Sequence, residues 1–199
     1  MRTFGLIPAA GKSRRMGRAK LALPLGDSTV LEHALAAVRA AGVADILVVV
    51  GPDGGELARL ARAACAFVLQ LPEDTPDMRA TTMHGLAWLE KQFHPADEDG
   101  WLLLPADHPT LHADVIRAIL AAAGNHAIVV PAYKGRRGHP TWLRWSHVAA
   151  IRAQPAELGL NAFIRSQGAG TFELAWPSEE ILRDLDTPED YERLLKDLP

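Results

Sequence analysis

Residues 4–20 read FGLIPAAGKSRRMGRAK, and no other stretch says as much about the fold. Its first residues, Phe4 to Ile7, are apolar and predict a buried strand. Gly11 and Gly17 then let the backbone turn sharply and approach a ligand closely. A strand that runs into a small, basic loop offers backbone N–H groups and positive charge to a polyphosphate. The cations of this loop include Lys12, Arg14, Arg15 and Lys20.

The glycine spacing matches neither of the two common phosphate-binding fingerprints. Arg18 follows Gly17, so the pattern G-x-x-x-x-G-K-[ST] is absent, and so is G-x-G-x-x-G. The plain alternative is an ordinary basic loop between a strand and a helix, whose arginines are only solvated.

Apolar strand-like runs alternate with helix-like stretches as far as Tyr133. The predicted strands are 4–8, 46–50, 66–71, 101–105 and 127–131, and the predicted helices are 31–41, 56–64, 81–93 and 113–123. This alternation predicts the α/β class, with a three-layer α/β/α, Rossmann-like and mostly parallel sheet. Ligands of such sheets bind at the carboxyl ends of the strands. We expect one domain over residues 1–199, with 134–180 as an elaboration that covers the site, a short strand at 171–176 and a closing helix at 188–198.

The composition of the chain indicates which kinds of ligand and partner it can bind. The chain has 199 residues, 48% of them hydrophobic, and a net charge of −3, which argues against a nucleic acid polymer and favours a small anionic ligand for the local basic cluster. No signal peptide or membrane span is evident, so we expect a soluble, cytoplasmic protein without membrane contact. Cys65 is the only cysteine, which excludes an intrachain disulfide, and its apolar surroundings predict a small buried side chain.

The basic loop resembles that of a family of nucleotidyltransferases, which share the pattern G-x-x-x-R-M-G-x-x-K. Here the pattern falls on Gly11, Arg15, Met16, Gly17 and Lys20. The family holds the molybdenum cofactor cytidylyl- and guanylyltransferases and the sugar-1-phosphate nucleotidyltransferases. The resemblance implies a sheet of the nucleotide-diphospho-sugar transferase type. It also implies that residues 9–12 and Arg15 cradle a triphosphate, with Ala9, Ala10, Gly11 and Lys12 as the contacts, while Lys20 neutralises charge on the α-phosphate.

A single aspartate follows the strand predicted over 101–105. The stretch LLLPADHP, residues 102–109, places Asp107 at the carboxyl end of that strand. A hard cation such as Mg²⁺ takes one or two protein carboxylates plus substrate oxygens, so Asp107 suits this duty. It also matches the acidic residue that holds the metal in the resembling family. The alternative is an aspartate that only caps the next turn.

A second carboxylate is expected from the stretch LRDLDTPEDY, residues 182–191, which looks like the close of the cytidylyltransferase branch. Thr187 suits the cap and Pro188 the first position of the closing helix. The metal ligand would be Asp184 or Asp186, of which Asp186 is favoured, and the sequence period does not decide between them.

Two further stretches carry expected binding residues by resemblance. YKGRRGHP, residues 133–140, looks like the branch with molybdopterin as acceptor, and its Arg136, Arg137 and His139 would hold the acceptor phosphate. His139 is as well explained by bracing a tight turn. Trp142 and Trp145 are expected in the core or a lid, with stacking on a pterin as the alternative. Residues 75–86 stand where the family contacts the nucleobase and ribose, through Met78, Thr81 and Thr82.

The resemblance implies transfer of CMP from CTP to a molybdopterin-type cofactor phosphate, with release of pyrophosphate. Lys20, Arg15 and Asp107 would be catalytic, and Asp107 with Asp186 would hold Mg²⁺. A recipient molybdenum enzyme or its chaperone is the implied protein partner. The alternatives are GTP as donor, another small phosphate as acceptor, and a nucleotide-binding module without catalysis.

Overall fold

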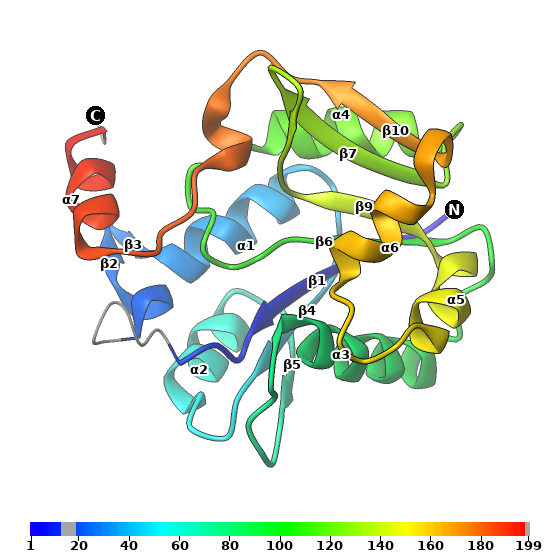
Figure 1. Cartoon of the computed structure of the whole chain (residues 1–199). Helices are drawn as coiled ribbons and strands as arrows, with labels where there is room; N and C mark the ends of the chain where they lie inside the picture. Colours follow the sequence, from blue (N-terminus) through cyan, green and yellow to red (C-terminus); the bar gives the residue numbers. More distant parts are fainter. Residues whose placement is uncertain (13–18, 198–199) are drawn as a thin grey trace.

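A computed structural model describes residues 1–12 and 19–197 and is organised around one twisted sheet (Figure 1). Within these residues the sheet contains β1 (Thr3–Ala9), β4 (Asp45–Val50), β5 (Phe67–Gln70), β6 (Gly100–Leu103), β7 (Ile128–Tyr133), β8 (Arg136–Arg137), β9 (Thr141–Arg144) and β10 (Thr171–Ala175). The strand order is β10-β7-β9-β6-β1-β4-β5, with β8 paired to β7. Among the described strands of this sheet, only β8 and β9 pair antiparallel with their neighbours, so the predicted mostly parallel sheet is confirmed.

Helices cover both faces of the sheet. They are α1 (Val30–Ala40), α2 (Gly55–Ala63), α3 (Met78–Phe93), α4 (Ala113–Ala123), α5 (Val148–Ala153) and α6 (Leu160–Ser166). Buried side chains of α1, α2 and α4 share one apolar cluster, and those of α3, α5 and α6 share another. The three-layer α/β/α prediction is therefore confirmed. A small hairpin of β2 (Pro24–Leu25) and β3 (Ser28–Thr29) leads into α1. The last helix, α7 (Pro188–Asp197), lies instead beside β2 and β3 (Figure 1).

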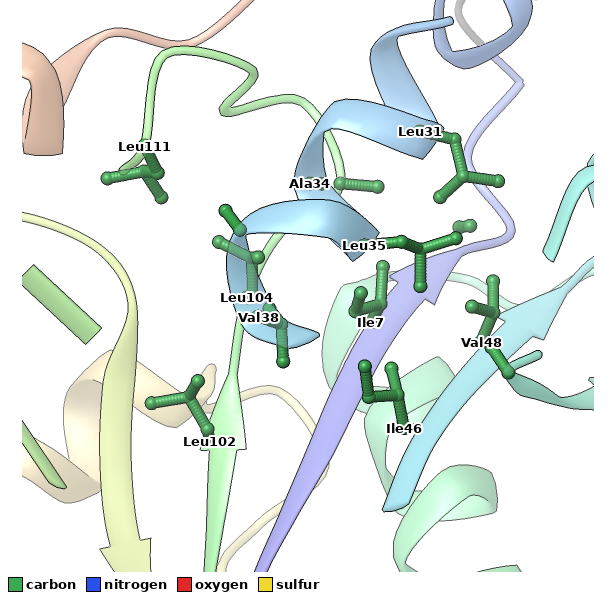
Figure 2. Close-up of a cluster of buried hydrophobic side chains, with 14 of the residues drawn as sticks. Ile7, Leu31, Ala34, Leu35, Val38, Ile46, Val48, Leu102, Leu104 and Leu111 are labelled. Carbon is green, nitrogen blue, oxygen red and sulfur yellow. The ribbon is translucent and has the colours of Figure 1, made fainter. Parts of the chain in front are cut away.

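The alternation of β1 explains the two clusters. Leu6 and Ile7 are both fully buried, Leu6 in the cluster under α3 and Ile7 in the cluster under α1. Figure 2 shows the apolar side chains of α1 above the sheet, with Leu35 close to Ile7. A capping box of Thr29 and Glu32 begins α1, and Gly42, in the left-handed region at φ +94°, follows its end.

The elaboration expected over residues 134–180 is partly built into the central sheet, because β9 and β10 both belong to it. β9 lies inside the sheet, between β6 and β7, and pairs antiparallel with both. Trp142 on this strand is fully buried and Trp145 is 5% exposed, so both belong to the core. Stacking of either indole on a flat ligand is therefore ruled out by burial.

We expect Trp142→Ala to lower the free energy of unfolding by about 3–5 kcal/mol, because the change leaves a large cavity in the sheet layer. The indole also donates a hydrogen bond from Nε1 to Oγ1 of Thr3, at 3.2 Å. Urea denaturation of the two proteins measures the difference. A loss below about 1 kcal/mol would show that this core position tolerates a cavity and would contradict the packing described here.

Two local expectations need correction. Cys65 is exposed and not buried, because it follows the last turn of α2 with a left-handed φ of 58° that turns it away from the core. Helix α3 begins at Met78 and not at residue 81, because the Asp77 carboxylate caps it by accepting from the backbone N–H of Ala80 at 2.7 Å. Among the described helices, none is long and apolar enough to cross a membrane.

Candidate active site

Lys20 joins two carboxylates that come from distant parts of the chain. Its Nζ donates to Oδ2 of Asp107 at 2.7 Å and to Oδ1 of Asp186 at 2.9 Å. The Lys20 side chain is 14% exposed, and the two carboxylates are 26% and 28% exposed. Burial alone lowers the pKa of Lys20, but the hydrogen bonds and charges of Asp107 and Asp186 outweigh it, so the pKa is raised and the ammonium stays charged.

The secondary structure explains why these groups meet. Lys20 begins a short 3-10 helix after the basic loop that follows β1, and Asp107 lies beyond the carboxyl end of β6. Since β1 and β6 are parallel neighbours, their carboxyl ends open onto the same edge of the sheet. Asp186 lies just before α7. The carboxylate of Asp190 holds it there by accepting hydrogen bonds from the backbone N–H groups of Asp186, at 3.1 Å, and of Thr187, at 2.8 Å.

Asp184 and Asp186 face different hollows. Asp186 lines the cavity that contains Lys20 and Asp107, whereas Asp184 lines a second hollow of about 350 Å³. The geometry therefore pairs Asp186, and not Asp184, with Asp107.

The larger cavity, of about 610 Å³, lies at the carboxyl ends of β1 and β6. Ligand pockets commonly have about 300–1,000 Å³, so a nucleotide-sized molecule fits this volume. Its lining brings together most of the residues expected from the sequence, namely Ala9, Ala10, Gly11, Lys12, Lys20, Met78, Thr81, Asp107 and Asp186. Arg15 lies outside the described residues.

Thr82 is not brought to this cavity. It is 1% exposed, and its hydroxyl donates to the carbonyl of Met78 within α3 at 2.8 Å. On α3 the Thr82 side chain points into the core, while Thr81 lines the cavity and contacts the Thr75 hydroxyl at 2.6 Å.

Asp74 belongs to the cavity but was missed from the sequence. Its carboxylate forms an ion pair with Lys12, which connects the loop after β1 to the loop after β5. Both side chains are about half exposed, so a bound polyphosphate could compete for Lys12. The usable signal was the position of Asp74 after a parallel strand, because every such loop opens onto the carboxyl edge of the sheet.

The three residues expected to hold an acceptor phosphate do not gather. Arg136 lines the second hollow, and Arg137 pairs with Glu173 at 2.8 Å. His139 instead packs against His108, with ring centroids 4.9 Å apart. Of these three side chains, Arg136 alone lines either of the two hollows.

A buried His108 and a partly buried His139 lie against each other beside Asp107. Nε2 of His108 lies 4.0 Å from Oδ1 of Asp107. Burial lowers the pKa of His108, and the charge of Asp107 only partly opposes this. Burial, followed by the effect of His108, lowers the pKa of His139 to about 4. Both rings are therefore neutral at pH 7.

His139 should make the fold acid-sensitive. An unfolded histidine takes up a proton near pH 6.5, whereas the folded His139 stays neutral down to about pH 4. The unfolded chain thus binds more protons in this window, so stability is full above pH 6.5 and falls by about 3 kcal/mol as the pH drops toward 4. Urea denaturation across this range should give a flatter profile for His139→Gln, and identical profiles would contradict the assignment.

The pair of carboxylates suits a hard divalent cation. Both reach one cationic centre at hydrogen-bond distance, and Mg²⁺ or Mn²⁺ prefers oxygen ligands of this kind. The described residues contain no cluster of three or more His, Cys, Asp or Glu side chains arranged for a metal ion. A cation here would therefore take its remaining ligands from substrate or water.

Comparison with protein families agrees with this arrangement. Residues 5–171 match the family described as the MobA-like NTP transferase domain. The chain belongs to this family. The class of reaction of this family is nucleotidyl transfer. The resemblance noted from the basic loop is therefore confirmed.

Alignments with individual relatives cover almost the whole of this chain. The purine catabolism protein PucB of Bacillus subtilis is 28% identical, covering 95% of this chain and 94% of its own. The molybdenum cofactor cytidylyltransferase of Escherichia coli is 27% identical, with coverage of 94% and 92%. The structure of Rv0371c in complex with manganese, from Mycobacterium tuberculosis, superposes with a TM-score of 0.78 at 27% identity and covers 98% of each chain.

Proposed function

We propose that the chain is a Mg²⁺-dependent nucleotidyltransferase that transfers CMP from CTP to the phosphate of a molybdopterin-type cofactor. An oxygen of the acceptor phosphate attacks the α-phosphorus of CTP, the bond from that phosphorus to the bridging oxygen of the β-phosphate breaks, and pyrophosphate leaves. The observation that carries the proposal is the contact of Lys20 with both Asp107 and Asp186 on the wall of a nucleotide-sized cavity.

Lys20 and the loop after β1 would bind the triphosphate. Ala10 and Gly11 offer a backbone with little side-chain bulk, and Lys12 adds charge at the mouth of the cavity. The raised pKa of Lys20 keeps a fixed positive charge where negative charge grows on the α-phosphate. Because the acceptor phosphate is already an oxyanion, the step needs no general base, and catalysis rests on positioning and electrostatics.

Asp107 and Asp186 would hold the divalent cation. When bound, the cation neutralises the triphosphate and orients the α-phosphate for in-line attack. The manganese complex of the structural relative supports a divalent cation in this fold, and the oxygen-only character of the two side chains suits one.

Met78 and Thr81 would contact the nucleobase or ribose, since both line the cavity at the start of α3. Arg136 lines the second hollow and not the cavity of Asp107, so its position does not support the expected contact with an acceptor phosphate that attacks the α-phosphorus. The preference for CTP and the choice of a molybdopterin acceptor rest on the sequence resemblance and on the cytidylyltransferase relative. A recipient molybdenum enzyme or its chaperone would take the product.

The test is a titration of the purified chain with CTP, GTP, ATP and UTP in Mg²⁺, first by thermal stability and then by pyrophosphate release with molybdopterin. CTP at about 100 times its Kd should add about 2.7 kcal/mol to the free energy of unfolding. Release of pyrophosphate should require both CTP and acceptor.

The other outcomes separate the alternatives. A preference for GTP would move the chain to guanylyl transfer. Stabilisation by CTP without pyrophosphate release in the presence of authentic acceptor would indicate another acceptor or a module without catalysis. Absence of any nucleotide effect would overturn the proposal.

A further inference from the structure

The segment that delivers Asp186 to the cavity, residues 179–186, is anchored by its apolar side chains. It begins as a short 3-10 helix (Glu179–Leu182) and then runs extended toward α7. Ile181 is fully buried and Leu185 is 1% exposed. In addition, the backbone N–H of Leu185 donates to the carbonyl of Asp107 at 2.8 Å. The segment is therefore tied to the loop of the other carboxylate one residue before Asp186.

Gly138 is the point where this segment meets the loop between β8 and β9. A Cβ at position 138 would lie 2.8 Å from the carbonyl carbon of Ile181 and 2.9 Å from its Cβ, closer than real Cβ atoms come. The Ile181 carbonyl oxygen would be nearer still. Gly138 is not in the left-handed region, so the close approach of Ile181, and not backbone conformation, explains the glycine.

Backbone hydrogen bonds hold this contact in register. The N–H of His139 donates to the carbonyl of Ile181 at 2.9 Å, and the N–H of Gly138 donates to the carbonyl of Pro131 in β7 at 2.8 Å. The central sheet thus supports Gly138 directly, and Gly138 supports the segment. A displacement of Ile181 would be passed to Asp186 through a short extended stretch.

We propose that Gly138 is a positioning residue that sets the place of Asp186 opposite Asp107. The inference rests on the proposed function, in which these two carboxylates hold the metal ion. It gives part of the G-R-R-G-H-P stretch a different task from acceptor binding: Gly138 and the backbone of His139 form the surface on which residues 179–186 dock. Arg136 at the other end of the stretch keeps its place at the second hollow.

Gly138→Ala tests the proposal in the full chain without nucleotide. Mn²⁺ affinity, measured by electron paramagnetic resonance of free Mn²⁺, should fall by about 10- to 100-fold, as for loss of other outer-shell supports of a metal site. Hydrogen exchange of the His139 and Leu185 amides should become faster. The His139 amide donates to Ile181 on the displaced segment, and the Leu185 amide, which is on that segment, donates to Asp107.

Gly100→Ala is the matched control. Its Cβ would lie 2.6 Å from Nε1 of Trp142, so this variant also crowds the core, but at the amino end of β6, away from Asp107. It should lose stability while keeping the Mn²⁺ affinity and the slow exchange of both amides. Wild-type affinity in Gly138→Ala would overturn the proposal, and so would an equal loss in both variants. Failure of the wild-type chain to bind Mn²⁺ both without and with CTP would instead overturn the proposed function.

A milder pair keeps the test decisive if Gly138→Ala does not fold. Ile181 and Ile151 are both fully buried, but only Ile181 lies on the docked segment. Ile181→Val should weaken Mn²⁺ binding severalfold, whereas Ile151→Val should leave it unchanged at a similar cost in stability. Equal Mn²⁺ affinity in the two variants would overturn the proposal.

Discussion

Lys20→Met is expected to reduce the rate of nucleotidyl transfer by about 10²- to 10³-fold, the range seen when one preorganised donor to a developing charge is removed. The side chain keeps most of its volume but loses the ammonium that Asp107 and Asp186 share. Single-turnover measurement of pyrophosphate release at saturating CTP and acceptor gives the rate of the chemical step directly.

The control for this prediction is Lys91→Met. Lys91 is an exposed cation in the last turn of α3 and does not line the cavity. Its variant should transfer at the wild-type rate. If Lys20→Met retained full activity while remaining folded, Lys20 would have no part in stabilising the transition state.

Asp186→Asn is expected to weaken Mn²⁺ binding strongly, because it removes a charged ligand. Loss of a residue that only supports a ligand weakens metal binding by about 10- to 100-fold, and we expect a larger effect here. Asn keeps the size of the side chain and one oxygen, so the effect reports on charge. Isothermal titration of the nucleotide-free chain with Mn²⁺ measures the affinity.

Asp184→Asn is a control only two residues away. The Asp184 carboxylate lines the second hollow and not the cavity of Asp107, so this variant should bind Mn²⁺ within about threefold of wild type, a change below 1 kcal/mol. The reverse result, with Asp184→Asn impaired and Asp186→Asn normal, would mean that the metal binds at the second hollow.

The parallel part of the sheet was predictable because its strands are continuous apolar runs separated by amphipathic helices. β9 was not, since Thr141 to Arg144 is short and its place depends on pairing with β6 and β7, which lie far away in sequence. Cys65 illustrates the same limit on a local scale. Its apolar neighbours suggest burial, but a left-handed turn at the end of α2 decides its exposure.

Sequence reasoning located the candidate site through groups that follow strands. Lys20 and Asp107 stand after β1 and β6, and the edge on which parallel strands end follows from fold class alone. The choice between Asp184 and Asp186 depends on how residues 179–186 pack against the rest of the protein. The sequence pattern does not contain this information. Thr82 was assigned to the cavity by resemblance of residues 75–86 to a family loop, but in α3 its hydroxyl donates to the Met78 carbonyl and its side chain is buried.

The central claim is transfer of a nucleotidyl group, and the fate of the α-phosphorus tests it most directly. The wild-type chain would be incubated with CTP labelled with ³²P at the α-phosphate, Mg²⁺ and molybdopterin, and the products separated by chromatography. We predict that the label moves to the acceptor, with one pyrophosphate released for each label transferred. Label that remains in CTP, or appears only in free CMP, would contradict transfer to this acceptor.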